Sequence, residues 1–86
     1  MKKVKHYIYP AIFTYEPNQE IAVVFPDLEC ATSGINDDDA LLAARELLCC
    51  VIKGLEEDGK VIPTSTALSL IETRPNERTV LIDVVV

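Results

Sequence analysis

The stretch from Asn36 to Gly59 constrains the fold most, because it has the pattern of one long amphipathic helix. Asn36 can cap the first turn with its side chain, and Asp37–Asp39 place carboxylates at the positive end of the helix dipole. Gly59 suits the left-handed position that follows a helix C-terminus. Such a helix would be roughly 33 Å long, so the rest of the chain must cover its apolar face. That face comprises Ala40, Leu41, Ala44, Leu47, Leu48, Val51, Ile52 and Leu55.

Four segments around this helix are predicted to be β-strands. They are rich in β-branched and aromatic residues and are separated by turn residues, and they span Val4–Thr14, Glu20–Phe25, Cys30–Gly34 and Thr79–Val86. The first two should form an antiparallel hairpin. The order β-β-β-α-β predicts an α+β fold in which one long helix packs on an antiparallel sheet.

Two features of these segments leave alternatives open. Pro10 cannot donate to a β-ladder, so it predicts an edge position or a bulge in the first strand. Residues 64–78 contain either a short helix, capped by Ser65 or Thr66 and ending at Ile71, or an irregular crossover.

The chain of 86 residues is long enough for one domain, 1–86, and 49% of its residues are apolar. A chain of this size buries only about 60% of its unfolded surface, so we expect stability to be gained by homodimerisation. Leu42 and Cys49 lie seven residues apart on the back of the helix and form a candidate dimer seam. The alternative is that they are scattered surface apolar residues, which are common.

The charge balance points to a protein partner. Fourteen acidic residues against eight basic ones give a net charge of −6, which disfavours direct nucleic-acid binding and suits a basic protein. Three cysteines form no even disulfide framework, and no signal peptide or membrane-length apolar run is present. We therefore expect a cytoplasmic protein without membrane contact.

The sequence offers little for catalysis, and we expect no enzyme, cofactor or metal site. Consecutive aspartates such as Asp37–Asp39 fan out around a helix and do not converge on a metal ion. His6 has no nucleophile linked to it in sequence, and Cys30 has no evident activating base. A minimal hydrolase built on His6 or on the three aspartates is the least favoured hypothesis.

The turn after the second predicted strand is a better candidate for a functional site. Pro26, Asp27 and Glu29 form a short acidic loop that could contact a basic partner. The alternative is a tight turn in which Asp27 only bonds backbone groups.

Several segments resemble, in order, the N-terminal domain of HicB-type antitoxins. The resemblance covers nearly the whole chain and rests on Tyr9–Phe13, Val24–Leu28, Cys30, Thr32, Gly34, Ala40–Leu41, Ala44–Glu46, Leu48, Gly59 and Ile62–Pro63.

This resemblance implies a partial ribonuclease-H-like α+β domain without nuclease carboxylates. It also implies a partner, a small basic HicA-type toxin that cleaves mRNA and that the antitoxin binds and masks. An acidic surface suits that role, since complementary charge speeds capture.

The chain departs from the family pattern in places. Glu29 alone stands where family members usually have Pro-Gly, and Ile35–Asp37 replaces Asp-Thr-Leu. Many such antitoxins continue into a C-terminal DNA-binding domain, which we expect this chain to lack. The alternative function is a stand-alone protein-interaction or ligand-binding module with no toxin partner.

Overall fold

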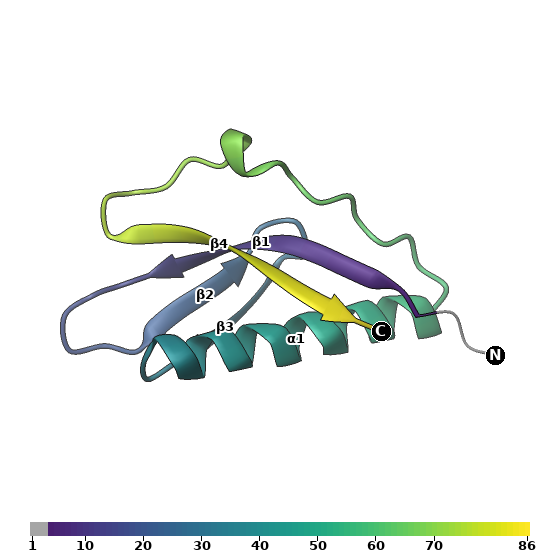
Figure 1. The fold of residues 1–86 in the computed structure, drawn as a ribbon, viewed down its shortest axis with the longest axis horizontal. Coiled ribbons are helices and arrows are strands. Elements are labelled where there is room, and N and C mark those ends of the chain that lie inside the picture. Colours follow the sequence, from purple (N-terminus) through teal and green to yellow (C-terminus); the bar gives the residue numbers. More distant parts are fainter. Residues whose placement is uncertain (1–3) are drawn as a thin grey trace.

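The computed structural model describes residues 4–86, which form a four-stranded sheet with one long helix against it (Figure 1). This is the α+β architecture and the β-β-β-α-β order that the sequence predicts. The elements in chain order are β1 (His6–Thr14), β2 (Ile21–Phe25), β3 (Cys30–Gly34), α1 (Asp37–Glu57), the 3₁₀ turn η1 (Leu68–Leu70) and β4 (Glu77–Val85).

The sheet has the strand order β3-β2-β1-β4, and every neighbouring pair is antiparallel. Helix α1 covers one face of the sheet, and the core lies between them (Figure 1). Alternate residues of each strand point to this face, as the two-residue period of a strand requires. The buried core residues of the sheet are Tyr9, Ala11, Phe13, Ile21, Val23, Phe25, Ile82 and Val84.

Both predicted ends of helix α1 are confirmed. The Asn36 side chain accepts a hydrogen bond from the Asp39 backbone N–H at 2.8 Å, and Gly59 is left-handed with φ of 66°. The buried stripe is narrower than the pattern suggested, because Leu41 is 39% exposed. The fully buried helix residues recur every four positions: Ala40, Ala44, Leu48 and Ile52.

Small residues let the first turn of α1 approach the sheet closely. A Cβ added to Gly34, the last residue of β3, would lie 2.3 Å from the backbone nitrogen of Ala40. No side chain fits at such a distance, so glycine at this position fixes how tightly the helix start can pack on β3.

The predicted bulge at Pro10 is wrong, and the predicted edge position holds only locally, because the side of β1 that faces β2 is unpaired at Pro10. Pro10 lies inside β1, which is an interior strand and pairs with β4 in one unbroken register from His6↔Val85 to Thr14↔Glu77. Reciprocal hydrogen bonds between Lys5 and Val86 place the backbone nitrogen of Pro10 on the side facing β2. The β1–β2 ladder has already stopped at Ile12↔Val24, so Pro10 removes no ladder bond.

The same register explains why the ladder stops there. One step beyond Ile12↔Val24, the next hydrogen-bonded pair would join Pro10 to Pro26. Neither proline has an N–H to donate, so the two strands part at this point and β2 turns towards β3.

Residues 58–76 form the crossover from α1 to β4, which arches over the side of the sheet opposite the helix (Figure 1). It is irregular apart from the three-residue turn η1, which no side chain caps. Of the two alternatives predicted for this segment, the irregular crossover is therefore the one observed. Two contacts fasten its first half: the Tyr9 hydroxyl donates to the Pro63 carbonyl, and Thr66 bonds Asp27. Further along, Val61 and Leu70 stand largely exposed.

Within residues 4–86, no helix has the length and apolar character needed to cross a membrane.

Candidate functional site

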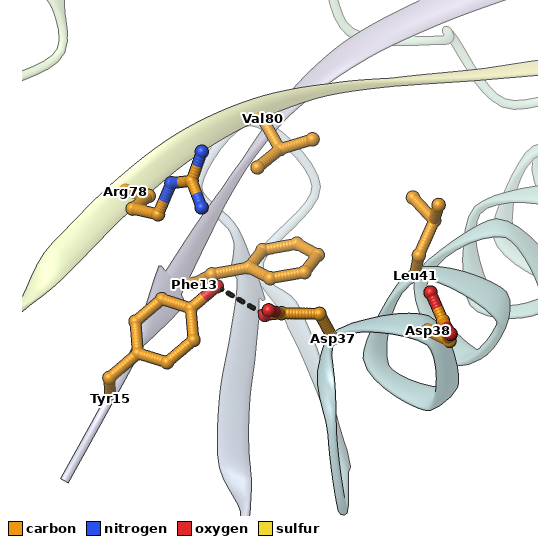
Figure 2. Close-up of a pocket in the computed structure, with 7 residues that line it drawn as sticks. All are labelled: Phe13, Tyr15, Asp37, Asp38, Leu41, Arg78 and Val80. Carbon is orange, nitrogen blue, oxygen red and sulfur yellow. Dashed lines mark hydrogen bonds between the residues drawn. The ribbon is translucent and has the colours of Figure 1, made fainter.

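A shallow open pocket of about 210 Å³ lies where the start of α1 meets β1 and β4 (Figure 2). Phe13 and Val80 come from the sheet and Leu41 from the helix, and together they give the pocket an apolar floor. Asp37 and Asp38 of the first helical turn and Arg78 of β4 supply charged groups around it. Tyr15, just after β1, completes the lining.

One hydrogen bond ties the two sides of the pocket together. The Tyr15 hydroxyl donates to the Asp37 carboxylate at 2.7 Å (Figure 2). This bond, together with partial burial and the negative charge of Asp37, raises the pKa of Tyr15 above its usual value, while the nearby Arg78 opposes the rise. Tyr15 therefore remains a neutral hydrogen-bond donor at physiological pH.

Further acidic residues lie at the same end of the molecule as the pocket. The turn between β1 and β2, which carries Glu16 and Glu20, is at the same end as the start of α1 (Figure 1). All three helix aspartates are exposed, and Asp39 is oriented by the Ile35 N–H, which donates to it at 3.0 Å. An apolar floor beside unneutralised carboxylates can hold a long basic side chain, whose alkyl part prefers apolar contact.

The acidic loop predicted to contact a partner, Pro26–Glu29, does not line this pocket. Its residues differ in exposure and in their contacts. Pro26 and Glu29 are exposed, and Glu29 has a left-handed backbone with φ of 51°. Asp27 is half-buried, and its carboxylate accepts from the Thr66 N–H at 2.9 Å and from the Thr66 hydroxyl at 2.5 Å. The carboxylate of Asp27 is thus engaged within the chain, while that of Glu29 faces solvent; contact of this loop with a partner stays a prediction.

The other residues considered for chemistry do not come together. His6 lies on the outer face of the sheet, 3.2 Å from the Asp83 carboxylate, and both side chains are about half exposed. Cys30 is half-buried, which raises the pKa of its thiol. Across residues 4–86, no three histidine, cysteine or acidic side chains are grouped closely enough to hold a metal ion.

The two residues of the predicted dimer seam have different surroundings. Leu42 is 61% exposed, whereas Cys49 is half-buried and packs against the hydrophobic core. Cys49 therefore has a role within one subunit, and the seam stays a prediction.

Several pocket residues were not singled out from the sequence. Tyr15, Arg78 and Val80 have no local motif. Tyr15 follows β1, whereas Arg78 and Val80 lie in β4 more than sixty residues later, and only the β1–β4 pairing brings them together. The alternation of β4 could have assigned Val80 to the helix-facing side, but not to a pocket.

Comparison with known proteins adds no relative, because the chain matches no protein-family model and no curated protein.

Proposed function

We propose that this protein is a HicB-like antitoxin domain. It would act in the cytoplasm by binding and masking a small basic HicA-type toxin that cleaves mRNA. It would work by occlusion: the toxin's cationic RNA-binding surface is covered, and no bond is made or broken. The ordered resemblance along the sequence and the α+β fold support this proposal.

The observation that carries the proposal is the combination, in the pocket between α1 and β4, of an apolar floor with two helix aspartates that outnumber the one cation, Arg78. The stem of a lysine or arginine can lie on Phe13, Leu41 and Val80 while its cation meets Asp38 and Asp37. Arginine should bind in this pocket more tightly than lysine, because its planar guanidinium forms two parallel hydrogen bonds to a carboxylate.

Charge beyond the pocket acts in the same direction. With a net charge of −6, the protein attracts a cationic partner before contact, which raises the association rate more than the final affinity. Exposed carboxylates at Glu16 and Glu20 extend the negative surface beside the pocket. The association rate should therefore fall steeply as salt is added.

Co-expression with the protein encoded by the adjacent gene, followed by pull-down, tests the partnership. If that protein is a toxin of this class, the wild-type chain should bind it and restore growth. Asp38→Lys should weaken rescue and slow association by about tenfold at low salt. Glu72→Lys is the matched control, because it makes the same charge change at an exposed crossover position away from the pocket.

Thermal unfolding of both variants excludes a simple loss of fold, since a lysine in the first helical turn also costs stability through the helix dipole. If both variants associate at the wild-type rate, the pocket is not the contact. If the wild-type chain neither binds nor neutralises the neighbouring protein, the antitoxin proposal fails.

A further inference from the structure

The outer edge of β4 is a nine-residue strand with no neighbour in the described part of the chain. β4 is the last strand of the sheet and pairs only with β1. In Figure 1 it runs along the near side of the molecule, and no segment passes in front of it. An uncovered strand edge is a template for pairing with another strand.

The register identifies the backbone groups on that edge. Val86 exchanges hydrogen bonds with Lys5, so the alternate residues Val84, Ile82 and Val80 also face β1 in the antiparallel pattern. The N–H and C=O groups of Thr79, Leu81, Asp83 and Val85 therefore point away from the sheet. None of these four N–H groups has a partner among the hydrogen bonds within residues 4–86.

β4 carries three charged side chains but lacks several other features that keep strand edges apart in monomeric proteins. It contains no proline, lysine or glycine, and its register with β1 has no bulge. Its one acidic group near the middle, Asp83, is paired with His6 of β1 at 3.2 Å on the outer face of the sheet. The other edge strand, β3, is short and contains Thr32, Ser33 and Gly34, so it offers much less for pairing.

The outer face of β4 also carries exposed aliphatic side chains beside Thr79 and Asp83. Leu81 is 51% exposed and Val85 60% exposed, and Ile8 of the neighbouring strand adds a third aliphatic side chain at 46%. Extending the sheet past β4 would cover part of this surface, in addition to pairing the free backbone groups.

We propose that β4 pairs antiparallel with β4 of a second copy, around a two-fold axis at Leu81, to make a continuous eight-stranded sheet. Leu81 is the middle of the strand that runs from Glu77 to Val85, so this register pairs its whole length. It places Leu81 opposite Leu81 and Thr79 opposite Asp83 of the other copy. The same patch meets itself, as a two-fold interface requires.

Charge favours this register over alternatives on either side. Sliding one copy by two residues in one direction would set Glu77 opposite Asp83. The same slide in the other direction would set Asp83 opposite Leu81, and a further two residues would set Asp83 opposite Asp83. Like charges directly opposite each other destabilise a strand pair. In the Leu81-centred register Asp83 instead meets the Thr79 hydroxyl, which can donate to it.

This inference is independent of the proposed antitoxin function, and it differs from the Leu42–Cys49 seam on the helix. The pocket is lined by Arg78 and Val80 of β4, whose side chains point to the helix side of the sheet. Pairing at the β4 edge therefore joins two pockets in one assembly.

Leu81→Pro tests the pairing sharply. Because the Leu81 N–H points outward, proline removes a bond between copies and none within the sheet of one copy. In sedimentation equilibrium we expect wild type at twice the 9.5 kDa of one chain and Leu81→Pro at the monomer mass. The dissociation constant should rise by more than about tenfold, since two bonds are lost per dimer.

Two control variants accompany it. Leu68→Pro makes the same exchange on the crossover and should stay dimeric, while Leu42→Glu places a charge on the helix seam and should also stay dimeric. Circular dichroism checks that each variant is folded. A monomeric wild type at hundreds of micromolar, or a dimer abolished by Leu42→Glu but kept by Leu81→Pro, overturns the proposal.

Amide hydrogen exchange on the wild-type protein gives a second, mutation-free readout. Val80, Ile82 and Val84 amides should be protected at every concentration, because they bond to β1. Thr79, Leu81, Asp83 and Val85 amides should gain protection only when the concentration is raised into the dimer range. Fast exchange of these four amides in a sample shown to be dimeric would place the interface elsewhere.

Discussion

Asp27 and Thr66 are joined by two hydrogen bonds, from the Thr66 N–H at 2.9 Å and from its hydroxyl at 2.5 Å. They connect the β2–β3 turn to the crossover that leads from α1 to β4. The Tyr9 hydroxyl, which donates to the Pro63 carbonyl, provides the neighbouring attachment. The first half of the crossover is thus held by a few polar contacts. In its second half, Leu68 and Leu70 are exposed and bury little apolar surface.

Replacing Asp27 by alanine should loosen the crossover. Both acceptors are lost and the partly buried Thr66 N–H is left unpaired, so the free energy of unfolding should fall by about 1–3 kcal/mol. Thermolysin should then cleave faster at the exposed Leu68 and Leu70. Glu29→Ala removes the exposed neighbouring carboxylate and should change neither quantity much; equal effects of the two variants would contradict the role assigned to Asp27.

Gly34 and Gly54 should respond oppositely to alanine. At Gly34 the new methyl group would collide with the Ala40 backbone at 2.3 Å, so the helix must move off β3 and we expect a loss of about 2 kcal/mol or more. At Gly54 a Cβ meets open space, and alanine in this helical position should add about 0.5–1 kcal/mol. Urea unfolding of both variants measures the difference, and a stable Gly34→Ala protein would refute the close approach.

Glu77 should make stability depend on pH in the acid range. The backbone N–H of Arg74 donates to its carboxylate at 2.8 Å, and this bond is the main cause that holds the pKa of Glu77 below its ordinary 4.5, with further help from Thr14. The carboxylate stabilises the fold above pH 4.5, and this contribution is lost as the pH falls through the lower folded pKa. An NMR titration of Glu77 should show a midpoint below pH 4.5, whereas a midpoint at or above 4.5 contradicts the assignment. In Glu77→Gln, the free energy of unfolding should fall less steeply as the pH is lowered through the acid range.

Cys30 and Cys50 should differ in reactivity. Burial raises the pKa of the Cys30 thiol from its ordinary 9.0, whereas Cys50 is exposed. Because the thiolate is the reactive form, iodoacetamide at pH 8 should modify Cys50 well before Cys30. Peptide mass spectrometry follows each site, and the rates should converge in urea. Rapid labelling of Cys30 in the folded protein would show that its surroundings are more open than described.

Features set by neighbouring residues could be predicted from the sequence. The Asn36 cap, the Gly59 terminus and the third strand, Cys30–Gly34, all depend on residues a few positions apart, and they match the structure. The two-residue period of a strand likewise puts Tyr7, Tyr9, Ala11 and Phe13 on one face of β1, and this face packs in the core.

Features set by distant residues could not be predicted. Pro10 is acceptable inside an interior strand only because the β1–β2 ladder ends before it, and that depends on Pro26 in another segment. The partner of Asp27 lies far along the chain at Thr66, and the pocket joins Tyr15 and Asp37 to Arg78. Sequence periodicity carries no record of such long-range contacts.

The reciprocal bonds between Lys5 and Val86 have a practical consequence. They hold Lys5 and Val86 side by side, so a short glycine-rich linker could join these two residues, and the chain could be reopened at the exposed η1 turn. Such a circular permutant would keep every strand pairing while moving the cut into the crossover.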